Sequence, residues 1–533
     1  GPLYLEISPR TFPIVVRRGS RLSQIRFRVG HALLGEAELF DLHKAETLVA
    51  SDMPNVSGGG IALSIDLKGS GPQGLIGYRG KHHTGVIDVD KKAAHDVLDF
   101  WEPLVNRGTE QFILDPDEFY ILVSRESVHV PPAYAAEMVR QSMVAQFKEE
   151  AYTRGLTVTT TLESSEQQTA YQALRRGILT YESRQRYRGP ELFVNLPADK
   201  ATREDVIDSV LAEHPDNGDL LSAVVLEAGP RKVVVVRQDG EPFAVTGEGL
   251  RPVQSGLAEK ADPSIKLRPG AVVRVVRTSA NGWRISQLPE VESAFVAMDP
   301  NTGAVHALVG GFDFQKNKFN HVTQAWRQPG SSFKPFIYSA ALEKGLTPMT
   351  VVNDAPLFYS AEQTGGKPWE PKNYDGQFEG PMSVRRALAK SKNMVSIRVL
   401  QLVGTKSAQD WVARFGFPPE RHPPYLTMAL GAGAVTPMQM TTGYAVFANG
   451  GHRVTPVLIT RVVEQRGKVL FDEPPKAVDA SSQVIDERNA FIMSSLLQEI
   501  TRTGTAARAQ ATLKRPDVYG KTGTTNDSMD AWF

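Results

Sequence analysis

The chain of 533 residues contains no cysteine. This absence excludes disulfides, thiolate nucleophiles and metal sites built from cysteine. The chain also lacks any run of about 18 apolar residues, the length that a membrane-spanning helix needs, and no signal peptide opens it. Lysine and arginine (60) almost balance aspartate and glutamate (59), so the formal charge is only +1. We therefore expect neither a nucleic-acid partner nor a membrane span in this chain.

The pattern of apolar residues changes along the chain, which is too long for a single core. Residues 1–130 alternate apolar and polar side chains as short strands do. Within PPAYAAEMVRQSMV (131–144) a charged, amphipathic helix begins without a linker. Strands return over 214–290 and favour a small barrel. After residue 290 strands and helices mix, with helices expected around 331–344, 383–403, 436–449 and 485–502 and a strand near 517–525.

A first chemical motif is RQPGSSFKPF, in which Lys334 follows Ser331 by three residues. This spacing puts both side chains on one face of a helix, one turn apart. A serine hydroxyl becomes a nucleophile when a base takes its proton, and lysine serves as that base when burial and nearby cations lower its pKa. Backbone N–H groups at the helix N-terminus suit an oxyanion. Alone, the motif is common, and most copies lie on a solvated helix face.

A second motif, AKSKNMVS, places Ser391 and Asn393 two residues apart, ahead of the apolar stretch MVSIRVLQLV. Here a hydroxyl can relay protons and an amide can hold a substrate carbonyl. The pattern is also common by itself, since Ser279 and Asn281 match it at a predicted hairpin turn.

A third motif, VYGKTGTTND, presents Lys521 and Thr522 on or beside a strand. A cation and a hydroxyl together suit a carboxylate, and Gly523 allows another backbone to approach. Taken alone, the tripeptide is explained by an exposed strand end followed by a turn.

In this order the three motifs resemble the signature of the penicillin-interacting serine enzymes. The surrounding sequence, including FVAMDPNTGAVHALVGG, WEPKNYDG and LGAGAVTPMQM, resembles the transpeptidase half of class A penicillin-binding proteins from about residue 135 to 533. This resemblance implies a serine D,D-transpeptidase that cross-links peptidoglycan stem peptides through an acyl-enzyme, without a cofactor or metal, and that β-lactams target. It assigns catalytic roles to Ser331, Lys334, Ser391, Asn393 and Lys521 and substrate binding to Thr522, Gly523 and Thr524.

In the mechanism that this resemblance implies, Ser331 attacks the D-Ala–D-Ala carbonyl with Lys334 as base. The backbone N–H groups of Ser331 and Thr524 form the oxyanion hole. Ser391 relays protons with Lys521, which also binds the terminal carboxylate with Thr522; Asn393 positions the donor stem.

Upstream, LYLEISPRTFPIVVRRGSRLSQIRFR and FILDPDEFYILVSRESVHVPP resemble the long, two-repeat bacterial dCTP deaminases over residues 1–139. In that family a glutamate activates water without zinc, and the resemblance maps this role to Glu6. We favour the alternative that Glu6 lies on the solvated face of an edge strand, because the nucleotide-binding segment of the family would precede it. His82 and His83 have no nearby carboxylate in the sequence, so we expect no metal site.

The expected chain is therefore multidomain. Its expected parts are an all-β deaminase- or dUTPase-like fragment (1–139), a helical linker (140–213), a small OB-like β-barrel (214–290) and an α/β (α+β) transpeptidase domain of the penicillin-binding and β-lactamase type, truncated at its C-terminus (291–533).

The two resemblances imply different compartments, the cytoplasm for the deaminase parent and the periplasmic face of the inner membrane for the transpeptidase parent. The leading hypothesis is a penicillin-sensitive transpeptidase portion that carries an inactive deaminase-like remnant. One alternative is a nucleotide-acting protein with a deoxynucleotide partner. Another is a non-functional chimera joined within residues 134–139, which fit both families. A β-lactamase fits less well, because the linker and the β insertion are typical of a cell-wall synthase.

Overall fold

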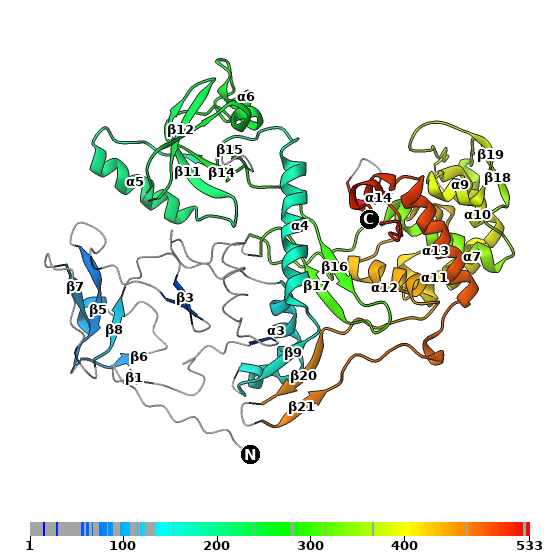
Figure 1. Ribbon diagram of the computed structural model, residues 1–533, viewed down its shortest axis with the longest axis horizontal. Coiled ribbons are helices and arrows are strands. Elements are labelled where there is room, and N and C mark those ends of the chain that lie inside the picture. Colours follow the sequence, from blue (N-terminus) through cyan, green and yellow to red (C-terminus); the bar gives the residue numbers. More distant parts are fainter. Residues whose placement is uncertain are drawn as a thin grey trace. The chain divides into compact units, whose positions relative to one another are not determined.

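The computed structural model divides into two compact units, residues Gly1–Pro131 with Gln146–Gly155 and residues Pro132–Ala145 with Leu156–Phe533 (Figure 1). The residues that the structure describes are 14–15, 28–29, 55–57, 60–62, 67, 74–82, 84–88, 96–106, 115, 118–122, 134–152, 154–238, 240–278, 282–314, 316–364, 367–464, 467–525 and 529–533. Within these ranges no helix is both long and apolar enough to cross a membrane.

The described part of the first unit consists mostly of short strands. Its best-defined sheet has the order β7-β5-β8, antiparallel throughout. Gly77 allows the close approach of β8, because a Cβ there would lie 2.2 Å from the carbonyl oxygen of Ile121. The elements are β1 (Ile14–Val15), β2 (Arg28–Val29), β3 (Asn55–Ser57), β4 (Gly60–Ala62), β5 (Leu75–Gly80), β6 (Ile87–Asp88), α2 (Val97–Phe100), β7 (Trp101–Val105), β8 (Tyr120–Leu122) and the 3-10 helix η1 (Lys148–Tyr152).

Helices dominate the region after the first strands, with α3 (Tyr134–Phe147), α4 (Ser164–Glu182) and α5 (Lys200–Glu213). On α3, Val139 and Met143 are buried one turn apart, which gives this helix a single apolar stripe. The long helix α4 packs on the strand β17 (Val305–Val309), as Figure 1 shows. Between α3 and α4, β9 (Thr157–Thr160) pairs with β20 (Ile459–Val463), which in turn pairs with β21 (Val469–Asp472).

A valine-rich sheet follows, in the order β10-β14-β11-β12-β13. The strand β15 also pairs with β14, outside this order. Its strands are β10 (Leu192–Phe193), β11 (Leu221–Ala228), β12 (Lys232–Val236), β13 (Phe243–Thr246), β14 (Ala271–Arg277) and β15 (Trp283–Ser286), with η2 (Gly247–Val253) and α6 (Gln254–Leu257) between β13 and β14. The predicted closed barrel is not found: β13 and β15 are near neighbours, but no backbone ladder joins them in the described residues. Instead, the rings of Phe243 and Trp283 stack at 4.5 Å between these strands.

The remaining residues form a helical region around an aromatic core. Its helices are η3 (Gly330–Phe333), α7 (Lys334–Glu343), α8 (Ala361–Thr364), α9 (Val384–Ala389), α10 (Asn393–Val403), α11 (Thr405–Arg414), η4 (Pro419–Arg421), η5 (Leu426–Leu430), α12 (Pro437–Ala448), η6 (Ala480–Ser482), α13 (Glu487–Arg502) and α14 (Ala507–Leu513). Phe333 and Phe336 are fully buried and pack against Phe415, Phe417 and Phe447, with ring centroids 4.8–5.4 Å apart. These contacts anchor the first turn of α7 to the core.

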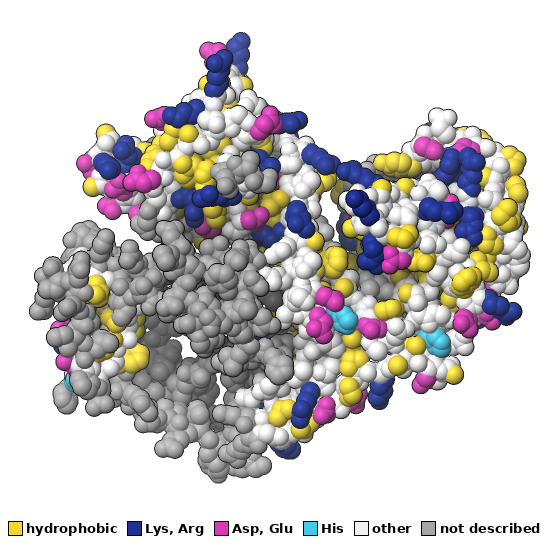
Figure 2. All heavy atoms as spheres, in the orientation of Figure 1, with side chains coloured by type: hydrophobic (Ala, Val, Ile, Leu, Met, Phe, Trp, Pro, Cys, Tyr) yellow, Lys and Arg dark blue, Asp and Glu magenta, His cyan; other side chains and the backbone are white. Residues whose placement is uncertain are grey.

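Three strand pairs border this core: β16 (Phe295–Met298) with β17, β18 (Val351–Asp354) with β19 (Gly380–Ser383), and β22 (Gly523–Thr524) with β23 (Ala531–Trp532). The helices expected around 331–344, 436–449 and 485–502 are present. The helix expected over 383–403 is divided into α9 and α10 by a turn at Lys390–Lys392. On the face in Figure 2, acidic and basic side chains of the second unit are interspersed.

Candidate active site

Ser331 lies in the 3-10 turn η3, directly before α7. The backbone of this turn packs on β22, and two glycines allow the contact. A Cβ on Gly330, whose φ is +54°, would lie 2.6 Å from the carbonyl oxygen of Thr524, and a Cβ on Gly523 would lie 2.4 Å from that of Pro329. The Ser331 hydroxyl makes no hydrogen bond to any residue that the structure describes. Its nucleophilic oxygen is thus uncommitted, one turn before Lys334.

Lys334 is fully buried and is held by the second motif. Its Nζ donates to the carbonyl oxygen of Ser391 and to Oδ1 of Asn393, each at 2.7 Å, and lies 3.2 Å from Ser391 Oγ. Burial, and then the charge of Lys521, hold the pKa of Lys334 well below its usual value, while the charge of Asp354 acts in the opposite direction. A neutral amine has two N–H groups, so the two carbonyl-type acceptors leave its lone pair available to accept a hydroxyl proton.

Lys521, from the third motif, also contacts the Ser391 hydroxyl. Its side chain is buried, and Nζ donates to Ser391 Oγ and to the carbonyl oxygen of Thr522, both at 2.8 Å. Burial lowers the pKa of Lys521 to about 7. Thr522 shares a hydrogen bond of 2.6 Å between its Oγ1 and that of Thr505, and Thr524 is exposed. The Ser391 hydroxyl therefore connects two buried amines whose pKa values are both lowered.

Ser391 owes its position to the way α9 ends. Its N–H donates to the carbonyl oxygen of Leu388 at 3.0 Å, and the N–H of Lys392 donates to that of Ala387 at 2.9 Å. This is a Schellman motif, whose left-handed position glycine usually fills. Ser391 has a φ of +59° there, a conformation that costs a residue with a Cβ about 1–2 kcal/mol. Such strain persists only where the surroundings enforce it, and it is typical of functional sites.

The sequence reasoning missed the residues that hold Asn393. The N–H of Asn393 donates to Oδ1 of Asn373 at 2.8 Å, and its Nδ2 donates to the carbonyl oxygen of Lys372 at 2.7 Å. Asn373 thereby caps α10, whose own N-cap residue, Lys392, makes no side-chain cap. The stretch WEPKNYDG (369–376) contributes to the resemblance but was given no chemical role. The polar residues of this stretch were the signal in the sequence that could have pointed to such a role.

All five predicted catalytic residues thus lie on three neighbouring segments: η3 with α7, the turn between α9 and α10, and the segment leading into β22. Glu6 and His83 lie outside the described residues. His82 does have a carboxylate partner, since its Nε2 lies 2.8 Å from Glu118 Oε1, which the sequence did not anticipate.

Comparison with known families agrees with this architecture. Residues 293–531 match the penicillin binding protein transpeptidase domain and residues 187–291 the penicillin-binding protein OB-like domain. Residues 1–31 and 35–151 match the N-terminal and C-terminal domains of 2'-deoxycytidine 5'-triphosphate deaminase. The domain boundaries drawn from the sequence at residues 139, 213 and 290 remain predictions.

Individual relatives point the same way. Penicillin-binding protein 1A of Neisseria lactamica is 42% identical over 402 residues, covering 75% of this chain and 50% of the relative. That of Pseudomonas aeruginosa is 38% identical over 452 residues, covering 75% and 54%. A crystal structure of penicillin-binding protein 1A from Haemophilus influenzae aligns with a TM-score of 0.69 at 33% identity, covering 77% of this chain and 65% of that one. The chain spans about half the length of the curated relatives that it matches.

The larger part of the chain belongs to the penicillin-binding proteins, with an OB-like and a transpeptidase domain. Within that family it is similar to the class A proteins of the 1A type, and its N-terminal residues are a segment of the dCTP deaminase family.

Proposed function

We propose that residues 291–533 catalyse acyl transfer on peptidoglycan stem peptides as a serine D,D-transpeptidase. The observation that carries this proposal is the environment of Lys334. Its buried amine donates only to neutral oxygen acceptors and stands one turn from the uncommitted hydroxyl of Ser331. A lysine whose pKa burial lowers in this way is suited to general-base catalysis rather than to ion pairing.

In the proposed reaction, Ser331 Oγ attacks the D-Ala–D-Ala carbonyl while Lys334 Nζ takes its proton. The backbone N–H groups of Ser331 and Thr524 stabilise the oxyanion; the packing of Gly330 against Thr524 supports this, because it brings the two segments into contact. Ser391, between Lys334 and Lys521, passes a proton to the leaving D-Ala nitrogen as the C–N bond breaks.

The second half of the proposed reaction regenerates the enzyme. Asn393 orients the donor stem, and Lys521 with Thr522 binds its terminal carboxylate. The amino group of a neighbouring stem then attacks the acyl-enzyme ester, loses its proton to the same base, and releases Ser331 as the cross-link forms. A β-lactam acylates Ser331 in the same way but leaves no small product, so the ester persists.

Covalent labelling with a fluorescent penicillin tests this proposal. We expect the full chain to take up one label, and S331A to take up none while keeping its thermal unfolding midpoint. The matched control is S332A, because the adjacent Ser332 hydroxyl is buried and donates to the carbonyl oxygen of Pro329. S332A should label. A folded chain without label, or equal labelling of S331A, contradicts the proposal.

A further inference from the structure

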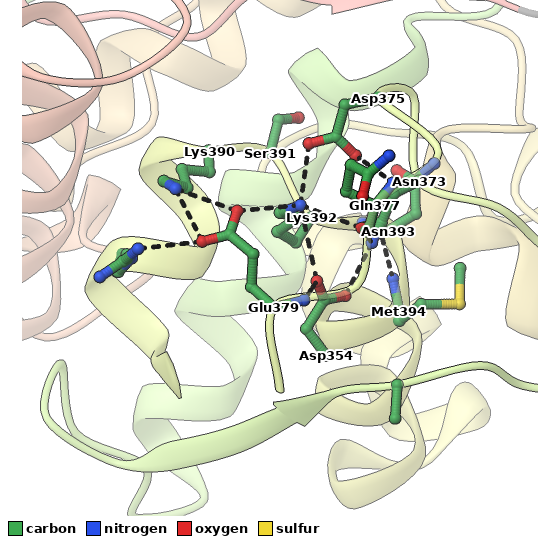
Figure 3. A network of polar contacts seen from close by, with 12 residues as sticks. Asp354, Asn373, Asp375, Gln377, Glu379, Lys390, Ser391, Lys392, Asn393 and Met394 are labelled. Carbon is green, nitrogen blue, oxygen red and sulfur yellow. Dashed lines mark hydrogen bonds and ion pairs between the residues drawn. The ribbon is translucent and has the colours of Figure 1, made fainter. Parts of the chain in front are cut away.

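Lys392 stands between Ser391 and Asn393 in the sequence, but its side chain points into a cluster of carboxylates (Figure 3). Its Nζ lies 2.9 Å from Asp375 Oδ2, 3.0 Å from Glu379 Oε1 and 3.6 Å from Asp354 Oδ2. The side chain is only 2% exposed. A buried ammonium with three carboxylates around it is an expensive arrangement to assemble, and on stability alone a packed apolar residue serves as well.

The cluster is joined to Asn393 through Asn373. Nδ2 of Asn373 donates to Asp354 Oδ1 at 2.8 Å, and its Oδ1 accepts the N–H of Asn393 at 2.8 Å. Because Nδ2 of Asn393 is committed to the carbonyl oxygen of Lys372, only its Oδ1 is left to face Lys334. The side-chain amide of Asn393 is thus oriented by Lys372 and Lys334. The backbone N–H of Asn393 is held by the chain of contacts that begins at Lys392 (Figure 3).

The same cluster contains a charge that acts on Lys334. Asp354 is fully buried, and its negative charge favours the protonated form of Lys334 and thus raises the pKa of that amine. The Lys392 ammonium, 3.6 Å from Asp354 Oδ2, carries the opposite charge and weakens this field. The charged groups that act on Lys334 are Lys521, before β22, and Asp354, on β18. Tyr338 lies one turn along α7, and Lys392, between α9 and α10, acts through its contact with Asp354.

We propose that Lys392, with Asp354 and Asn373, forms a positioning clamp for the general base. The clamp fixes the turn that presents Ser391 and Asn393 to Lys334, and the Lys392 charge offsets that of Asp354, which by itself favours the protonated form of Lys334. Lys392 is thus a positioning residue that touches no substrate. This inference rests on the proposed function for its consequence in catalysis, but the charge compensation itself is a property of the folded chain.

The test compares K392M, K392R and D354N in the full chain, with thermal unfolding measured for each. Lysine labelled with 13C at Cε allows the Lys334 side chain to be titrated by NMR, with its resonance assigned through K334M. Acylation by a chromogenic cephalosporin is followed across the same pH range. We expect K392M to move the Lys334 titration to higher pH by about one unit. The pH at which the acylation rate falls on the acid side should rise by the same amount, so the rate at lower pH should be about tenfold smaller than in the parent chain.

The companion variants give opposite expectations. K392R keeps the charge and should keep both profiles. D354N removes the field of the carboxylate and should move both profiles to lower pH, so the proposal remains testable if K392M does not fold. A folded K392M or D354N with an unmoved Lys334 titration overturns the clamp, because mere structural support leaves that titration unchanged. If the titrations move as expected but no variant or parent chain is acylated, the clamp stands and the proposed transpeptidase function fails.

Discussion

The OB-like sheet and the transpeptidase region both bury cations, but they treat them differently. In the sheet, Arg274 on β14 is buried and paired with the carboxylate of Glu191, with its Nη2 2.9 Å from Glu191 Oε2. Although burial alone would raise the pKa of Glu191, the hydrogen bonds from Arg274 hold it below its usual value. In the transpeptidase region, Lys334 and Lys521 are as deeply buried, yet the described residues place no carboxylate in contact with either ammonium.

Lys392 shows that this region is able to pair a buried lysine when pairing is what the fold needs. Burial works against its charge, but hydrogen bonds with Asp375 and Glu379 outweigh that effect and raise the pKa of Lys392. Two buried lysines of this region therefore differ in the direction of their pKa shifts, which is upward for Lys392 and downward for Lys334. The difference between the paired lysine and the proposed general base lies in the acceptors, which are carboxylates for Lys392 and neutral oxygens for Lys334.

The largest expected effect comes from removing the unpaired amine. K334M should lower β-lactam acylation by about 10²–10⁴, the usual contribution of a general base. It should not lower the unfolding midpoint, because an apolar side chain of similar length replaces a buried amine that no carboxylate contacts in the part of the chain that the structure describes. The matched control is K344M, at the exposed C-terminal end of the same helix. Full acylation of K334M would contradict the comparison.

The next effect concerns the paired cation of the sheet. R274M should lower the free energy of unfolding by about 3 kcal/mol, because Glu191 loses its guanidinium partner and remains partly buried. Acylation per folded molecule should stay unchanged. R231M, at an exposed position before β12, should change stability by no more than about 0.5 kcal/mol. Chemical denaturation with parallel labelling measures both quantities, and a stable R274M would remove the distinction between the two regions.

Sequence spacing predicted much of the candidate site, because it depends on local geometry. Lys334 follows Ser331 by three positions, and a helical turn brings the two to one face whatever surrounds it. The spacing of Ser391 and Asn393 reflects a turn, since Ser391 holds the left-handed position of the Schellman motif and Asn393 begins α10. The single helix predicted over 383–403 was wrong because serine, not glycine, fills the left-handed position and gives no signal for a break.

What the sequence could not provide was the set of long-range partners. Asn373 and Asp354 lie 20 and 39 residues before Asn393, and no pattern of apolar spacing links them. The predicted closure of the β-sheet was wrong for a similar reason. Gly249 brings η2 so close to β15 that a Cβ there would lie 2.1 Å from the carbonyl oxygen of Trp283, and this segment lies where a barrel would need β13 and β15 to pair.

A third prediction concerns His422, a buried base with no role in the site. Its ring stacks on Phe333 at 4.8 Å, and neither ring nitrogen has a hydrogen-bond partner in the described residues. Burial lowers the pKa of His422 to about 4, from an unfolded value of 6.5. The unfolded chain therefore binds the extra proton first, so stability present above pH 6.5 is lost as the pH falls towards 4, by about 2–3 kcal/mol.

H422F tests this pH dependence, because phenylalanine keeps the stack and cannot be protonated. Denaturation curves between pH 7 and 4 should show a smaller loss of stability for H422F than for the parent chain. Equal slopes would mean that His422 is not the group that titrates. Acylation at neutral pH should be the same in both, since His422 contacts the core and no predicted site residue.

The smallest expected effect separates strain from chemistry at Ser391. S391A and S391G both remove the hydroxyl between Lys334 and Lys521 and should lower acylation equally. Only glycine relieves the φ of +59°, which costs a residue with a Cβ about 1–2 kcal/mol, partly offset by the greater freedom of glycine in the unfolded chain. S391G should therefore be more stable than S391A by roughly 0.5–1 kcal/mol in denaturation.

Lys514 provides the matched control, because it too is left-handed, with a φ of 52°, at the C-terminal end of α14. K514G should gain the same stability as S391G gains over S391A, and it should lose no acylation. Comparison of S391G with K514G then shows whether the strained backbone at Ser391 is retained because its hydroxyl is needed for acylation. If S391A proves more stable than S391G, the turn is not strained in solution, and the Ser391 hydroxyl is positioned by its contacts with Lys334 and Lys521 alone.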